Sequence, residues 1–222
     1  MKKNTRKLKK AALLLCSAVL LVCISIGATV AYLTSTDKVT NTFTVGNVKI
    51  TLDEAKVDAN GAKVKDEEGN DVARVQANSY KLMPGHTYTK DPMIHVDAAS
   101  ENCWLFVKVE NGIAAIEDAN KTIAAQMTAN GWTLVENTTN IYKYKETVSG
   151  GANIPVFGEF AISNAVIGGM KPITTDGAGD DGKLYLDEYK NAKIVITAYA
   201  IQADGFSTAE AAWTAAGSSF TA

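Results

Sequence analysis

Histidine and cysteine are scarce in this sequence of 222 residues, which contains two histidines and three cysteines. His86 and His95 do not form the H-E-x-x-H pattern of a helical zinc site, and no serine stands in a G-x-S-x-G nucleophile motif. A Gly-rich phosphate loop is missing as well. We therefore assign no catalytic residue, no cofactor and no metal ligand, and we predict that the protein is not an enzyme.

Basic residues are scarce outside the N-terminus. Residues 1–31 hold six of the 22 Lys and Arg and no acid, which leaves 16 basic against 24 acidic residues and a net charge of −8. Arg74 is the only arginine in that part. A nucleic-acid partner requires clustered Lys and Arg that displace counterions from phosphates. The composition therefore argues against nucleic-acid binding.

A long apolar run occurs only near the N-terminus, which excludes a multi-pass membrane protein. Residues 1–10 are basic, residues 11–26 are uncharged and apolar, and small residues follow. This layout predicts a secretory signal peptide over residues 1–31, cleaved between Ala31 and Tyr32, and a secreted protein that meets the membrane only as a precursor. The alternative is an uncleaved anchor, because the uncharged stretch is long enough to cross a bilayer of about 30 Å.

Only one cysteine lies outside this segment. Cys16 and Cys23 fall within the apolar run, so the mature chain retains Cys103 alone and no intrachain disulfide is possible. Cys103 begins an apolar stretch, which predicts a buried thiol.

The mature chain is expected to be mostly β, an antiparallel β-sandwich with one longer helix that is preceded by the signal peptide. Alternating apolar residues predict strands at residues 42–52, 93–96, 103–109, 132–135, 140–146, 156–162 and 193–201, with a weaker candidate at 72–82. Helical spacing over residues 116–129 ends at Gly131, which suits a C-terminal glycine cap, and residues 208–216 predict a short helix.

Residues 32–52 form the first segment after the predicted cleavage site, ahead of a β-sandwich domain over residues 53–222. We predict a strand at its C-terminal end, with a β-bulge at Gly46 and Asn47 where the alternation changes phase. Its apolar side chains are Phe43, Val45, Val48, Ile50 and Leu52.

Two turn-rich regions follow the pattern of exposed loops. Residues 53–71 are acidic and contain Asn60-Gly61, which predicts an exposed hairpin turn. Residues 176–188 are rich in Asp and Gly, but glycines occupy the first and third positions of a calcium loop aligned on Gly182. This stretch is not an EF-hand, and a looser calcium site built from backbone carbonyls remains open.

Three stretches of the sequence resemble the TasA/camelysin family of exported proteins of Gram-positive bacteria, whose precursors are cut by the signal peptidase SipW. The first comprises residues 27–34 and 41–46, similar to the family's processing site and first mature strand. The second is Leu-Met-Pro-Gly-His-Thr-Tyr-Thr-Lys-Asp at residues 82–91, and the third is the strand at residues 193–202.

This resemblance implies a β-sandwich of jelly-roll type that acts as a secreted, non-enzymatic structural subunit of a biofilm-matrix or cell-surface fibre. It also implies that the N-terminal segment of one subunit, residues 32–52 with the five apolar side chains named above, is an assembly segment that completes the sheet of the next subunit by strand addition. The implied partners are further copies of the chain in a homopolymer, other matrix proteins, and the signal peptidase during export.

Two alternatives stay open. A camelysin-like cell-surface metallopeptidase would need His86 and His95 to converge on a metal with acids such as Asp91 and Asp97. A surface adhesion module would need aromatic side chains exposed on one face. The three tryptophans that would supply them are Trp104, Trp132 and Trp213.

Overall fold

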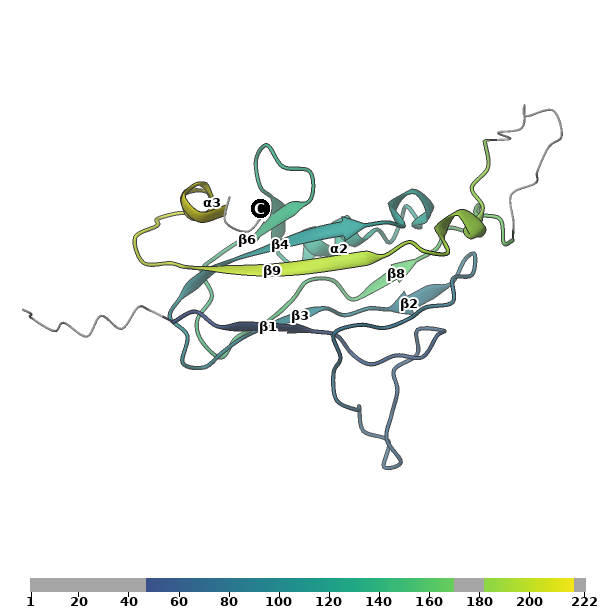
Figure 1. Cartoon of the computed structure of the whole chain (residues 1–222), viewed down its shortest axis with the longest axis horizontal. Coiled ribbons are helices and arrows are strands. Elements are labelled where there is room, and N and C mark those ends of the chain that lie inside the picture. Colours follow the sequence, from purple (N-terminus) through teal and green to yellow (C-terminus); the bar gives the residue numbers. More distant parts are fainter. Residues whose placement is uncertain (1–46, 170–181, 218–222) are drawn as a thin grey trace, which may run out of the picture. The chain divides into compact units, whose positions relative to one another are not determined.

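A computed structural model describes residues 47–169 and 182–217 (Figure 1). The described residues all belong to one unit of the chain, Val45–Ala222. They form a mostly β fold with antiparallel sheets and two α-helices, which confirms the predicted β-rich class. None of the helices in these two ranges is long and apolar enough to cross a membrane.

Nine strands and two α-helices make up the described part of the chain. The strands are β1 (Ile50–Asp53), β2 (Thr87–Thr89), β3 (Met93–Val96), β4 (Cys103–Asn111), β5 (Trp132–Leu134), β6 (Ile141–Tyr144), β7 (Asn153–Pro155), β8 (Glu159–Ala161) and β9 (Ile194–Gln202). The helices are α2 (Ile123–Ala129) and α3 (Ala209–Ala216), with 3-10 turns η1 (Ala114–Ile116) and η2 (Leu186–Tyr189).

The longest strands, β4 and β9, pair along their whole length in a four-stranded sheet of order β5-β6-β4-β9. Cys103, Leu105 and Val107 point to one face of β4 and are fully buried, and Phe106 is fully buried on the other. This confirms the predicted strand at residues 103–109 with both faces covered. The Cys103 thiol is buried, as predicted, and burial raises its pKa to about 11.

A three-stranded sheet of order β1-β3-β7 lies below β4 and β9 in Figure 1. Ile94 and Val96 of β3 belong to the same cluster of buried side chains as Leu105 and Val107 of β4. We call this cluster the main core. β2 and β8 form a separate two-stranded sheet, and their Tyr88 and Phe160 stack in the same core with ring centroids 4.8 Å apart.

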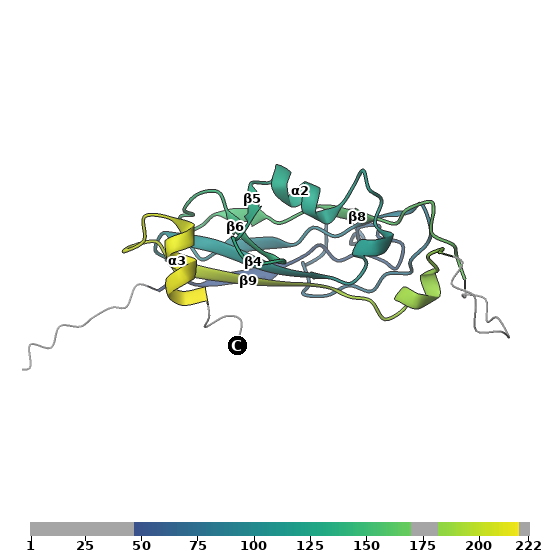
Figure 2. The same cartoon turned by 90° about the horizontal axis from the view of Figure 1, so that it is seen from above.

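Helix α3 packs on the opposite face of the four-stranded sheet (Figure 2). Its Ala212 is fully buried against Phe106, and the Trp213 ring lies 5.0 Å from the Phe106 ring. Thr208 caps the helix by accepting a hydrogen bond from the N–H of Ala211. The predicted short helix at residues 208–216 is confirmed.

The hairpin predicted at residues 132–135 and 140–146 is also confirmed, as strands β5 and β6. Tyr142 and Tyr144 both pack against the main core, as expected from their common parity. Asn137 adopts a left-handed conformation (φ 60°) in the connecting turn.

The helix predicted at residues 116–129 is confirmed only over residues 123–129, and its predicted first half is wrong. Only α2, seven residues long, is α-helical there, and residues 114–116 form the turn η1. Asp118 accepts a hydrogen bond from the N–H of Asn120, which closes a local turn in competition with helix formation. Thr122 then starts α2 by capping the N–H of Ala125, and Gly131 follows the helix with φ +89°, as predicted.

Strand boundaries near the N-terminus also differ from the prediction. Of residues 42–52, those before residue 47 lie outside the described residues, and β1 starts at Ile50 and extends to Asp53. The strand predicted at residues 72–82 is wrong, since only a single bridge joins Val75 to Glu54. Strands β2 and β7 were not predicted, and each has only three residues.

The acidic segment after β1 contains two tight turns in succession. In the first, Asp58 accepts hydrogen bonds from the N–H groups of Asn60 and Ala62, and Gly61 has φ +82°. In the second, Asp66 plays the same role and Gly69 has φ +85°. The predicted Asn-Gly turn is thus confirmed, and isolated bridges take the place of strands around both turns.

These two glycines give a matched pair for mutation. An alanine Cβ at Gly69 meets nothing within 4 Å, so we expect Gly69→Ala to lower the free energy of unfolding by about 1 kcal/mol through its positive φ alone. At Gly61 the same Cβ lies 2.7 Å from Tyr88 Cα, so we expect a loss of about 2–4 kcal/mol. Urea unfolding of both variants measures the difference, and equal losses would contradict the packing of the first turn on Tyr88.

Candidate functional site

A cleft of about 1760 Å³ lies between strand β1 and strand β9, which belong to different sheets. Its walls are formed by residues 50–54 on one side and residues 192–198 on the other. Residues 76–80 and 82–84 line a third side. Each of the two strands stands at the end of its sheet, so the cleft is bounded by two sheet edges.

The backbone groups on these edges point into the cleft. Val96 of β3 stands opposite Ile50, but its N–H bonds to the Ala152 carbonyl on the side away from β1. The backbone hydrogen bonds between β1 and β3 are therefore made by the alternate residues of β1, Thr51 and Asp53. Antiparallel ladders alternate, so the N–H and C=O groups of Ile50 and Leu52 face outward. Among the described residues, no backbone partner bonds to these outward groups.

The edge of β9 has the same character. Val109 of β4 donates to Asn140 on the β6 side, so its partner Ile196 in β9 turns its N–H and C=O away from β4. The same alternation applies along β9. The residues whose backbone groups face the open edge are Ile194, Ile196, Ala198, Ala200 and Gln202.

Apolar side chains line the cleft from both strands but are only partly buried. Ile50 and Leu52 of β1, and Ile194, Ile196 and Ala198 of β9, all pack against the main core. Apolar side chains in such positions gain further free energy when more of their surface is covered, roughly 25 cal/mol per Å². The cleft therefore combines an unfilled apolar surface with two unpaired strand edges, which is a suitable binding site for an extended peptide.

The predicted assembly segment meets this cleft at its C-terminal end. Ile50 and Leu52 lie in β1, opposite Val96 and Ile94 of β3, and form one wall of the cleft. Val48 packs against the main core just before β1. Phe43 and Val45 lie outside the described residues, as do Ala31 and Tyr32 of the predicted cleavage site.

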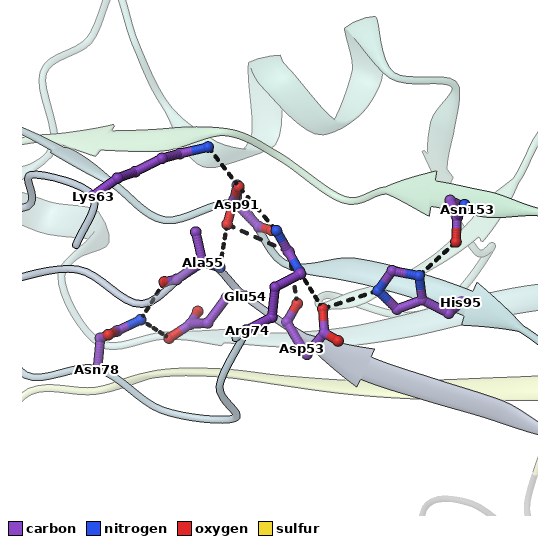
Figure 3. Close-up of polar contacts among 9 residues, drawn as sticks. All are labelled: Asp53, Glu54, Ala55, Lys63, Arg74, Asn78, Asp91, His95 and Asn153. Atoms are coloured by element: carbon purple, nitrogen blue, oxygen red, sulfur yellow. Dashed lines mark hydrogen bonds and ion pairs between the residues drawn. The ribbon is translucent and has the colours of Figure 1, made fainter. Parts of the chain in front are cut away.

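A network of charged side chains fixes the end of β1 and the segment that follows it (Figure 3). Arg74 donates from Nε to Asp53 Oδ1 and from Nη2 to the Asp91 carbonyl, the latter at 2.8 Å. Asp91 in turn accepts from the Ala55 N–H at 2.6 Å and faces Lys63 Nζ at 3.5 Å. Arg74 therefore connects residues on both sides of the two acidic turns.

His95 extends this network across β3 to β7 (Figure 3). Its Nε2 lies 2.9 Å from Asp53 Oδ1, and its Nδ1 lies beside Asn153 Oδ1. Both neighbours are acceptors, so the imidazole satisfies both when both ring nitrogens carry protons. The hydrogen bond to Asp53 raises the pKa of His95, and, against the opposing effect of burial, hydrogen bonds from Arg74 and His95 lower the pKa of Asp53.

The two histidines have separate surroundings. His86 Nε2 lies 2.8 Å from the Asn60 carbonyl, and its ring stands edge-on to Tyr88. Asp97 pairs with Lys49, which is not among the partners of His95 and Asp91 described above. Within residues 47–169 and 182–217, no group of three or more His, Cys, Asp or Glu side chains is placed to hold a metal ion.

The tryptophans of the adhesion alternative point in different directions. Trp132 is fully buried in the main core and donates from Nε1 to the Pro155 carbonyl at 2.9 Å. Trp104 and Trp213, the latter a residue of α3 itself, are half-buried on the other face of the four-stranded sheet. Of the Asp/Gly stretch at residues 176–188, residues 176–181 lie outside the described residues, while Asp187 and Glu188 belong to η2.

Sequence reasoning missed the buried charges beside the cleft. Among described residues, Glu54 and Lys90 are the only charged side chains classed with the core, at 4% and 8% exposure. A signal was present, because Lys90 shares parity with the fully buried Tyr88 and alternation directs both inward. Arg74, the only arginine after residue 31, was a second signal for a specific ion-pair role.

Comparison of the chain with family models, with curated proteins and with solved structures finds no match in any of the three. The family resemblance carried by the three sequence stretches therefore remains a prediction.

The His95–Asp53 pair predicts a pH-dependent stability. The folded-state pKa of His95 is above its ordinary value of about 6.5, so its stabilisation is complete below that pH and disappears as the pH rises through the folded-state pKa. Asp53 stays ionised over this range because its pKa is lowered from 3.8. We expect His95→Gln to destabilise the protein more at about pH 5.5 than at about pH 9, by roughly 0.5–1 kcal/mol.

Urea unfolding at the two pH values measures this difference. The matched control is the same substitution in an Asp53→Asn background, where the pH dependence of the His95→Gln effect should disappear. An effect that is the same at both pH values in the Asp53 background would contradict a charged His95 in the folded state.

Proposed function

We propose that the protein is a secreted, non-enzymatic structural subunit of a biofilm-matrix or cell-surface fibre, and that the cleft between β1 and β9 accepts the N-terminal segment of a neighbouring subunit. The observation that carries this proposal is the cleft itself, with apolar walls and an unpaired strand edge on each side. An extended peptide in this position gains backbone hydrogen bonds from the edges and apolar contacts from the walls.

The proposal includes a β-sandwich of jelly-roll type. Its support is the main core, which draws side chains from both the β1-β3-β7 sheet and the inner face of β4 and β9. In a sandwich whose sheets share one core, a gap at one side exposes the core to water. A strand added from a neighbour along one of these edges covers the gap and removes that edge.

The proposed occupant of the cleft is the segment from Tyr32 to Gly46 of a second copy. It contains Phe43 and Val45, which alternate with polar residues and can direct two apolar side chains inward. β9 has nine residues, so a strand that covers its edge needs a length of about 30 Å, which nine or ten extended residues provide. The segment has fifteen residues and is long enough.

Covalent continuity determines the kind of assembly. The segment leads directly into β1, so in each subunit the inserting strand is joined to one wall of that subunit's own cleft. Insertion into the next subunit is then a head-to-tail contact between unlike surfaces. Such contacts build open filaments unless the rotation between subunits closes a ring.

The first test is electron microscopy of purified protein that begins at Tyr32, beside a variant that begins at Asn47. We expect filaments from the longer protein and monomers from the shorter one, since only the former carries an inserting strand. A peptide of residues 32–46 should bind the shorter protein and raise its melting temperature. Filaments from both proteins, or from neither, would contradict strand insertion.

The second test places a charge in the cleft. Ile196 of β9 lines the cleft and packs on the main core, whereas Thr133 of β5 is exposed and lies outside the residues that line the cleft. We expect Ile196→Lys to prevent filament formation and weaken binding of the peptide at least tenfold, because a lysine there must be desolvated by the incoming strand. Thr133→Lys is the matched control and should assemble normally, because it adds the same charge outside the cleft.

Equal assembly of the two lysine variants would remove the cleft from the mechanism. Circular dichroism of each variant shows whether the domain is folded, which separates loss of the binding site from loss of the fold.

Export and processing are tested by N-terminal sequencing of the protein recovered outside the cell. We expect it to start at Tyr32, because small residues end the apolar run at Ala31. A protein that keeps residues 1–31 and stays with the membrane fraction would support the anchor instead.

A further inference from the structure

Three side chains that sequence reasoning did not connect meet beside the cleft. Glu54 follows β1, Lys90 follows β2, and Asn78 lies in the segment between them. Lys90 Nζ hydrogen-bonds Glu54 Oε2, and Asn78 Nδ2 donates to Glu54 Oε1 at 2.9 Å. One buried carboxylate therefore holds an amine on one oxygen and a carboxamide on the other.

The Asn78 carboxamide is held rigidly by the backbone of the residues after β1 (Figure 3). Its Nδ2 also donates to the Ala55 carbonyl at 2.9 Å, and its Oδ1 accepts from the Val57 N–H at 3.0 Å. All three hydrogen bonds act on one planar group and fix its orientation. The Val57 N–H also polarises the carbonyl and can stabilise negative charge on Oδ1.

The surroundings are poor in water. Glu54 is 4% and Lys90 8% exposed, and the ring of Tyr80 is nearby, with its hydroxyl donating to the Thr89 carbonyl at 3.1 Å. Burial and the charge of Glu54 raise the pKa of Tyr80. Desolvation disfavours separated charges, so proton transfer from the ammonium to the carboxylate, giving a neutral amine and a neutral acid, becomes accessible.

We infer that Lys90 and Asn78 are the substrates of a self-catalysed cross-link, an isopeptide bond between Lys90 Nζ and Asn78 Cγ for which Glu54 is the catalytic acid and base. The juxtaposition of nucleophile, carboxylate and oriented carboxamide is what the reaction needs, and it requires no cofactor or oxidant.

The step balances within the three side chains. Glu54 Oε2 takes a proton from Lys90, and the neutral Nζ attacks Asn78 Cγ, which moves an electron pair onto Oδ1 beside the Val57 N–H. Collapse of this tetrahedral species breaks the Cγ–Nδ2 bond. Glu54 Oε1, already in contact with Nδ2, delivers a proton to it, and the second proton of the amine restores the acid as ammonia leaves. For the attack, Nζ leaves its place at Glu54 Oε2 and moves to Cγ by rotation about the flexible four-carbon stem of lysine.

The cross-link would join two segments that otherwise meet only through hydrogen bonds. It closes a loop from residue 78 to residue 90 around the turn at Pro84 and Gly85, and it ties the third wall of the cleft to the end of β2. The inference stands on this cluster alone and does not depend on assembly into fibres.

Intact mass spectrometry of the purified protein tests the inference. We expect a mass lower by one ammonia than the sequence predicts from the observed N-terminus. Trypsin normally releases residues 75–81, which contain Asn78, from residues 82–108, which would be cut after Lys90. In the linked protein these pieces remain joined as one branched peptide, with no cleavage after Lys90.

Variants identify the roles of the three residues. Lys90→Arg, Asn78→Ala and the isosteric Glu54→Gln should each show the full mass of their own sequence, and Lys63→Ala should keep the loss of ammonia because Lys63 is a more exposed lysine paired with Asp91. Should any variant fail to fold, the peptide map of the unaltered protein decides by itself.

Two results would overturn the inference. One is an unaltered protein with the full sequence mass and a free peptide of residues 75–81. The other is a loss of ammonia without the branched peptide, because ring closure at Asn60-Gly61 releases ammonia as well and would persist in Lys90→Arg.

Discussion

The main core depends on a sheet arrangement that leaves one side unfinished. Burial of β3 and β4 side chains draws two sheets together, yet β1 and β9 remain unpaired at the edges where those sheets come closest to meeting. Backbone N–H and C=O groups must find partners in water or in another strand, and apolar side chains nearby favour the strand. The cleft is thus the part of the fold that most favours contact with another chain.

The long central elements could be predicted because one cause dominates them. β4 is an apolar run with both faces covered, and in β9 and the β5-β6 hairpin apolar residues recur along the strands, so the pattern alone identifies these elements. Residues 116–129 failed because the helical spacing says nothing of the Asp118 turn that interrupts it. The short strands β2 and β7 depend on partners far along the chain, which no local pattern records.

The candidate sites likewise contain parts that the sequence predicts and parts that it does not. The apolar residues of β1 that line the cleft were identified from their alternation, whereas the cleft itself exists only because two distant edges lie opposite each other. Glu54 and Lys90 are 36 residues apart, and Arg74 reaches Asp53 and Asp91 from a segment without regular structure. Each of these contacts forms only when the segment that connects β1 to β3 folds. The sequence alone shows only that charged residues are present there.

The antiparallel pairing of β1 with β3 has a mechanical consequence. In a fibre built as proposed, tension enters each subunit at the residues before β1 and acts along that strand. The β1-β3 ladder runs in register from Ile50 opposite Val96 to Asp53 opposite Met93, so the load falls on its hydrogen bonds in shear, all at once, and does not peel them one by one. The Arg74 contacts with Asp53 lie at the far end of the same strand and resist its withdrawal. Pulled along its axis, the fibre would therefore be strongest where each subunit joins its own inserting strand to its core.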